Sequence, residues 1–256
     1  MKHLDRRRAE GFGALADQYE RTRPSYPAEL VAWLSADGPG AAVDVGCGTG
    51  RVSGLLMAAG WKVIGIEPDQ RMAAIARSRG VEVLVSTFEQ WDAPRSGFDL
   101  VAAGTAWHWV DPDVGFDKAA SLLRPGGTLA IFRNSYRYNP EVAAIIDRKL
   151  RLHAPHLLSD CVPLGTADPN RMDSHREAAE NRVDLFAVVE HRAFRHERLV
   201  SVGDWIAELR THSPIMLLDG SVANHLLSAL AGQVKAEVGD DVHIMHETHC
   251  VLARRR

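Results

Sequence analysis

The chain has 256 residues, of which 46% are hydrophobic and 25% charged, and its formal net charge is −3 at pH 7. These values are typical of a globular protein, and the charge gives no reason to expect nucleic acid or an anionic membrane as a partner. No apolar run is long enough to span a membrane, and three scattered cysteines do not form a disulfide framework. Because the N-terminus is charged and lacks an apolar segment, we predict no secretory signal and a cytoplasmic location.

The N-terminal part of the sequence predicts two short helices. Residues 8–22 place Phe12, Leu15 and Tyr19 on one face at helical spacing. The prolines at positions 24 and 27 end this helix, and a second helix is expected over about 28–36.

The chain is organised around residues 41–50, where an apolar run ends in three glycines at alternate positions, Gly46, Gly48 and Gly50. A helix-capable segment follows, so the pattern predicts a strand, a glycine turn and a helix. Glycine accepts positive φ and lets the backbone approach a ligand, while the helix N-terminus supplies free N–H groups. Asp44 precedes the turn by two residues, and its carboxylate suits a cationic ligand better than a pyrophosphate.

Four more strands are predicted over 62–67, 81–85, 98–104 and 128–132, alternating with helices. This alternation predicts an α/β fold with a doubly wound, mostly parallel sheet and helices on both faces. Ligands bind such sheets outside the carboxyl ends of the strands. Glu67 lies at one of these ends, where it either accepts the two hydroxyls of a ribose or is simply solvated.

The C-terminal half predicts helices over 141–153, 172–181, 202–210 and 222–238, with strands over 185–199 and 241–254. Basic residues near the first of these helices form either a solvated face or part of a lid over the substrate. His243, His246, His249 and Cys250 alternate between the two faces of the last strand. They would not converge there, so we predict no metal site.

Three motifs give the sequence a family resemblance. They are the glycine turn, Phe98-Asp99-Leu100-Val101 with the aromatic turn through Trp107 to Pro112, and the Leu-Arg-Pro-Gly-Gly turn at 123–127. Together they resemble motifs of the class I S-adenosylmethionine (SAM)-dependent methyltransferases, most closely the small-molecule type 11 and trans-aconitate branch. The resemblance covers about 12–132 strongly and the remainder only in layout.

The resemblance implies one methyltransferase domain with a Rossmann-like, seven-stranded sheet and an antiparallel C-terminal strand inserted at the sheet edge. Residues 1–37 would form an N-terminal cap and 40–133 the SAM-binding core. Residues 134–183 would form a helical lid or insert, and 184–256 the strands and helices that complete the sheet. The implied cofactor is SAM, with S-adenosylhomocysteine as its product.

The resemblance also implies roles for individual residues. Thr87 stands where the family commonly has an acid, Phe88 either stacks on adenine or packs in the core, and Cys47 is more easily explained as a small filler. His108 acts either as a general base or, with its neighbours, as a pocket wall. The residues implied to bind the cofactor are Asp44, Gly46, Cys47, Gly48 and Gly50 at the turn, Glu67 and Pro68 at the ribose, Thr87 and Phe88 at the adenine, Gly104 and Thr105 at the fourth strand, and Tyr19, Arg23 and Tyr26 in the cap. Those implied to face the acceptor are Trp107, His108, Trp109 and Arg137.

The predicted function is methyl transfer to a small-molecule acceptor by in-line displacement, which proximity alone can accelerate strongly. The acceptor atom stays open, and we expect a monomer or homodimer. Two alternatives are kept: an NAD(P)-dependent oxidoreductase and a non-catalytic SAM-binding regulatory protein.

Overall fold

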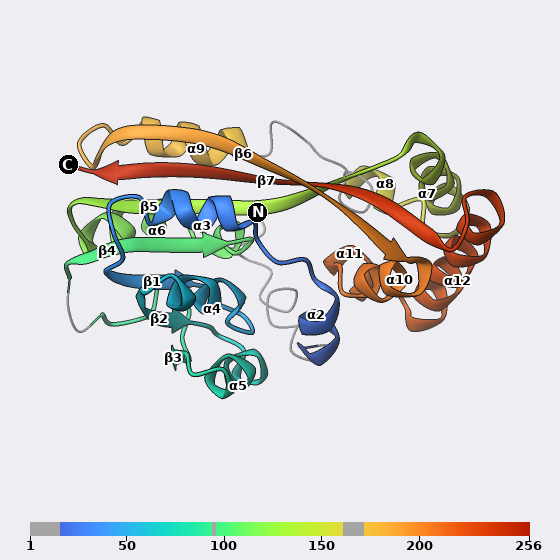
Figure 1. Cartoon of the computed structure of the whole chain (residues 1–256), viewed down its shortest axis with the longest axis horizontal. Coiled ribbons are helices and arrows are strands. Elements are labelled where there is room, and N and C mark those ends of the chain that lie inside the picture. Colours follow the sequence, from blue (N-terminus) through green and yellow to red (C-terminus); the bar gives the residue numbers. More distant parts are fainter. Residues whose placement is uncertain (1–15, 94–95, 161–171) are drawn as a thin grey trace.

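A computed structural model describes residues 16–93, 96–160 and 172–256. Its centre is a seven-stranded sheet with the order β3-β2-β1-β4-β5-β7-β6 (Figure 1). Strands β1 to β5 are parallel, and β7 is antiparallel to both of its neighbours. The predicted fold class is confirmed, and the antiparallel C-terminal strand β7 is inserted between β5 and the edge strand β6. The strands are β1 (Ala41–Val45), β2 (Lys62–Ile66), β3 (Glu82–Leu84), β4 (Phe98–Gly104), β5 (Leu123–Tyr138), β6 (Phe186–Ser201) and β7 (Asp241–Arg255).

Five of the described helices begin where the sequence supplies a capping side chain. The carboxylates of Asp69, Asp111 and Asp219 and the side chains of Asn139 and Ser201 each accept a backbone N–H of the first turn that follows. The helices are α2 (Ala16–Thr22), α3 (Ala28–Leu34), α4 (Arg51–Ala58), α5 (Gln70–Ser78), the 3-10 turn η3 (Trp107–Trp109), α6 (Pro112–Leu122), α7 (Pro140–His153), α8 (Leu157–Asp160), α9 (Asp173–Glu180), α10 (Val202–Arg210), α11 (Ser213–Met216) and α12 (Gly220–Glu237).

Helices cover both faces of the parallel strands, and alternate strand residues belong to different cores. Val43, Val101 and Ile131 pack with α6 and α9 on one face. Ala42 and Phe132 pack with α3 and α4 on the other. Because both faces are buried, the strands are almost continuously apolar, as parallel sheets require.

The strands β5, β6 and β7 continue beyond the parallel sheet and carry a second group of helices (Figure 1). There Tyr136 and Tyr138 of β5 form a separate apolar cluster with α7, α10 and α12. The predicted end of the core at residue 133 therefore falls inside a strand, because β5 stays paired with β7 as far as Tyr138. In the described parts of the chain, no helix combines the length and apolarity that crossing a bilayer requires.

Candidate functional site

The glycine turn has the conformation that its sequence predicts. Gly46, Gly48 and Gly50 have φ values of 62°, 58° and 80°, a region that side chains with a Cβ rarely occupy. The turn is also crowded, because a Cβ added at Gly46 would lie 2.6 Å from the Cβ of Ala106. Helix α4 follows at once, and its N-cap Gly50 has no side chain to cap it. In its first turn the backbone N–H of Ser53 faces the carboxylate of Asp44.

Glu67 connects the ends of the first two strands. Its two carboxylate oxygens accept the backbone N–H groups of Gly48 and Asp69, each at 2.9 Å. A carboxylate has about four lone-pair positions, so two remain for the hydroxyls of a ribose. Glu67 is 7% exposed, and burial raises its pKa to about 7. Pro68, partly buried, turns the chain away immediately after it.

Asp44 is a second buried carboxylate at the same edge of the sheet. It is 1% exposed and accepts a hydrogen bond of 2.6 Å from the hydroxyl of Ser53. Burial is the largest cause that raises its pKa to about 7. Among the described residues, neither Asp44 nor Glu67 forms an ion pair with a cationic side chain. Two buried carboxylates without a cation favour a ligand that brings positive charge.

Cys47 packs within this turn and does not offer a reactive thiol. Its side chain is 6% exposed and its Sγ lies 2.6 Å from the position that a Cβ on Gly65 would occupy. Burial raises the pKa of the thiol, so the reactive thiolate is disfavoured. The geometry supports the interpretation of Cys47 as a small filler.

The cap helix α2 is joined to the glycine turn through Glu20. The Glu20 carboxylate accepts a hydrogen bond from the Thr49 hydroxyl and pairs with Arg51 at 3.2 Å and Arg79 at 2.5 Å. Glu20 could not be identified from the sequence, because apolar periodicity does not indicate which distant cations an acidic side chain will contact. Tyr19 lies in α2, but its side chain falls outside the described part of the structure.

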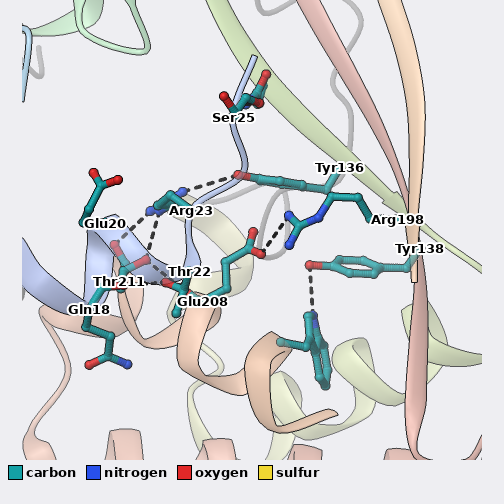
Figure 2. A network of polar contacts seen from close by, with 12 residues as sticks. Gln18, Glu20, Thr22, Arg23, Ser25, Tyr136, Tyr138, Arg198, Glu208 and Thr211 are labelled. Atoms are coloured by element: carbon teal, nitrogen blue, oxygen red, sulfur yellow. Dashed lines mark hydrogen bonds and ion pairs between the residues drawn. The ribbon is translucent and has the colours of Figure 1, made fainter. Parts of the chain in front are cut away.

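Arg23 and Tyr26 extend the cap along the strand tips. The Arg23 guanidinium donates to the hydroxyl and carbonyl of Thr211 at 2.9 and 2.8 Å and to the Tyr136 hydroxyl at 3.4 Å (Figure 2). The hydroxyl of Tyr26 lies 3.0 Å from that of Thr105, at the end of β4. The cap thus reaches from β4 to the turn after α10.

The end of β4 carries backbone strain. Thr105 has a φ of 56°, which is unfavourable for a β-branched residue, and its N–H donates to the carbonyl of Phe132 at 2.7 Å. Gly104 has no room for a side chain, since a Cβ there would lie 2.6 Å from Val52 and 2.9 Å from the Tyr26 hydroxyl. Such strain is concentrated at ligand sites.

The aromatic turn divides into a buried and a partly exposed part. Trp107 is 3% exposed and packs against Phe116, with ring centroids 5.2 Å apart. The rings of His108 and Trp109 are partly exposed and lie 4.7 Å apart. Trp107 therefore acts as core, and the other two side chains are the ones accessible to an acceptor.

Three other residues, predicted to bind the adenine or to face the acceptor, are placed less favourably for those roles. The Thr87 hydroxyl accepts the backbone N–H of Gln90 at 3.3 Å. Phe88 is 4% exposed and packs against Trp107, which favours its core interpretation over adenine stacking. Arg137 is exposed near Glu247, on the face of β5 opposite to Tyr136, so the structure does not bring it to the aromatic turn.

The histidines of β7 do not form a metal centre with their neighbours. Within residues 16–93, 96–160 and 172–256, no group of three or more His, Cys, Asp or Glu side chains has a metal-binding arrangement. His243 instead pairs with Glu197, and His249 with Glu247.

Known proteins resemble the chain most clearly over its N-terminal half. Residues 43–131 match a family model described as a methyltransferase domain. An uncharacterised methyltransferase of Mycobacterium tuberculosis H37Rv is 35% identical over 126 residues, which are 48% of this chain and 52% of that protein. A trans-aconitate 2-methyltransferase of Acidovorax ebreus is 37% identical over 117 residues, 44% of each chain. The chain thus spans about half the length of these curated relatives.

Solved structures share the whole fold at lower identity. A candidate type II methyltransferase from Anaeromyxobacter dehalogenans has a TM-score of 0.68 at 22% identity and covers 91% of this chain and 97% of its own. Phosphoethanolamine N-methyltransferase 2 from Haemonchus contortus, solved with SAM, has a TM-score of 0.54 at 16% identity and covers 94% and 57%. These likenesses establish the class I methyltransferase fold.

Proposed function

We propose that this chain, whose residues 43–131 form a methyltransferase domain on a class I methyltransferase fold, transfers the methyl group of SAM to a small molecule. The observation that carries the proposal is the pair of buried carboxylates, Asp44 and Glu67, beside the glycine turn. SAM brings a sulfonium, an ammonium and a ribose to this edge. The pyrophosphate of a dinucleotide would instead be repelled by Asp44, so an NAD(P)-dependent oxidoreductase is not favoured.

The residues present fit SAM. Glu67 is oriented by the N–H groups of Gly48 and Asp69 and would receive the ribose hydroxyls, while Asp44 would stabilise the cationic methionine end. When bound, SAM supplies a methyl group on an already activated leaving group. The chain's own contribution is then to align the acceptor and exclude water, which requires no strong base.

The cap and the aromatic turn would provide that alignment. Glu20 holds α2 over the glycine turn, and Tyr26 spans to Thr105 at the end of β4. His108 and Trp109 are the partly exposed side chains next to this point. A small-molecule acceptor is further supported by the trans-aconitate 2-methyltransferase among the relatives.

Calorimetric titration tests the cofactor, and a transfer assay tests the activity. We expect SAM and S-adenosylhomocysteine to bind and NADH and NADPH to leave no detectable heat. S-adenosylhomocysteine formation is then followed with panels of carboxylic acids, phenols and amines. Turnover with one class supports the proposal. Preferential binding of NAD(P)H would refute it, and tight SAM binding without turnover across all panels would indicate a non-catalytic SAM-binding protein.

A further inference from the structure

A group of aromatic and histidine side chains lies beside the cap, outside the cofactor edge. The strand register places Tyr136 of β5, His246 of β7 and His196 of β6 next to one another on one face of the sheet. The His246 ring lies edge-on to the Tyr136 ring and is stacked on the His196 ring, and in both pairs the ring centroids are 4.9 Å apart. The ring of His212, which follows α10, packs against the Tyr136 ring, with the two ring centroids 5.7 Å apart. We call these four residues the Tyr-His cluster.

The cluster contains buried nitrogen atoms without partners. His246 is fully buried, and among the described residues neither of its ring nitrogens has a hydrogen-bond partner. The same holds in this part of the structure for Nε2 of His212, which is 8% exposed, and for Nδ1 of His196. Buried polar groups in native proteins are nearly always hydrogen-bonded. Four orphaned nitrogens in one cluster therefore call for polar partners that the described residues do not supply.

The charges around the cluster indicate the charge of the group that would bind there. Arg23 approaches Tyr136 from the cap, and Arg198 lies in the next row of β6, where it pairs with the buried Glu208 at 3.5 Å (Figure 2). Two guanidinium groups thus face one buried carboxylate, and the second acid near the cluster, Glu29 beside His196, is exposed to solvent. Burial and Arg23 hold the pKa of His212 well below its usual value, so this histidine is neutral and offers one N–H donor. Donors in a cationic setting suit an oxyanion.

The cap connects the cluster to the end of β4. Phe132 and Tyr136 are four residues apart on β5 and therefore on the same face. The cap runs along this face: Tyr26 contacts Phe132 edge-on and holds Thr105, and three residues earlier Arg23 holds Tyr136. One short segment of chain therefore separates the end of β4 from the Tyr-His cluster.

We propose that the Tyr-His cluster is the subsite that binds an oxyanion of the methyl acceptor, a carboxylate or a phosphate, between Arg23 and His212. The proposal rests on the proposed methyl-transfer function. The cap covers the subsite in this structure, so the oxyanion enters when the contacts of Arg23 with Thr211 open. The acceptor's nucleophile would then project along the cap toward Thr105.

The test is a titration of the wild-type chain, with and without saturating S-adenosylhomocysteine. The probes are benzoate, succinate and inorganic phosphate, with benzamide and succinamide as neutral counterparts. We expect at least one anion to bind and its amide not to bind; the anion that binds distinguishes a carboxylate from a phosphate acceptor. In a long-range ¹H–¹⁵N spectrum of the wild-type chain, that anion should shift histidine ring nitrogens, a measurement that needs no variant.

Variants locate the subsite. His246→Phe and His212→Phe keep an aromatic ring but remove the nitrogens, and each should weaken anion binding at least tenfold while the affinity for S-adenosylhomocysteine stays within twofold. His225→Phe, at an exposed position of α12, is the matched control. If no anion binds or shifts the ring nitrogens, or if both variants bind the anion like the wild type, the nitrogens are satisfied by ordered water and the proposal is refuted. Failure of S-adenosylhomocysteine to bind would instead refute the proposed function.

Discussion

Replacing Glu67 by glutamine separates the cost of burying its charge from its use in binding. The side chain keeps its size, but one oxygen becomes an NH₂ group that faces a backbone N–H, either that of Gly48 or that of Asp69. Hydrogen bonds to a charged group contribute about 1.5–3 kcal/mol each. Because one bond within the site and one to the ribose are weakened, we expect SAM affinity to fall by about 2 kcal/mol, roughly thirtyfold.

The stability of the unliganded chain should respond differently. Burial raises the pKa of Glu67 from 4.5 to about 7, which corresponds to a penalty of about 3 kcal/mol for the ionised form. Glutamine avoids this penalty above neutral pH, and this offsets the lost hydrogen bond. We therefore expect the unliganded melting temperature at about pH 8 to stay the same or rise, although binding weakens.

The assay combines calorimetric titration of SAM with thermal denaturation. Glu82→Gln is the matched control, because Glu82 is an exposed carboxylate on the adjacent strand β3 and its loss should change neither quantity. An unchanged SAM affinity in Glu67→Gln would refute the ribose assignment. A large fall in unliganded stability together with weaker binding would show that Glu67 acts mainly by holding the glycine turn.

Four further predictions concern the same edge of the sheet. Gly48→Val should leave a folded chain, because the nearest atom to an added Cβ is 3.5 Å away. A φ of 58° is unfavourable for valine, so the turn should distort and SAM affinity should fall at least tenfold. Normal cofactor binding in calorimetry would contradict the turn assignment. Because the pKa values of Asp44 and Glu67 are raised to about 7, their contribution to unliganded stability is lost as the pH rises through about 7. SAM affinity should rise over the same interval, so melting temperature and affinity measured at about pH 6 and 8 should change in opposite directions, and parallel changes would exclude this linkage. Glu20→Gln should accelerate SAM dissociation several-fold in stopped-flow measurements, because the half-buried ion pairs of Glu20 to α4 and to the end of α5 contribute about 1 kcal/mol. An unaltered dissociation rate would mean that α2 does not restrain the cofactor. His108→Ala should lower turnover at saturating acceptor, with recovery at high pH, if the imidazole is a base; a change confined to the Michaelis constant would identify a pocket wall.

Local sequence signals predicted most of the fold. Each strand of the parallel sheet follows from an apolar run between turns, and the glycine turn follows from alternate glycines with positive φ. The predicted end of β5, at 132, is too early, because the signal for the true end is not local. Tyr136 and Tyr138 remain in the strand only because β7, more than a hundred residues later, pairs with them.

The positions of candidate site residues could be predicted where they follow from strand ends, and could not where they depend on distant contacts. Asp44 and Glu67 could be placed because the carboxyl ends of parallel strands share one edge. Glu20 and the partner of Arg23 could not, since Thr211 lies 188 residues away in sequence and nothing in either segment indicates the other. Phe88 illustrates a different limit: an aromatic after a strand fits both a cofactor face and a core, and only its 4% exposure favours the core.

The cap links the two parts of the molecule that the proposed methyl transfer would use. On one side α2 contacts the cofactor edge through Glu20, and on the other Gln18 donates to the carbonyl of Ala207 in α10 at 2.9 Å. Arg23, just after α2, adds a hydrogen bond to the hydroxyl of Thr211 in the turn after α10. Because one helix carries both sets of contacts, it cannot move away from the glycine turn without also disturbing the turn after α10. We expect cofactor binding to restrain α2 and with it the turn after α10, so the acceptor should bind more tightly to the cofactor-loaded chain than to the free one.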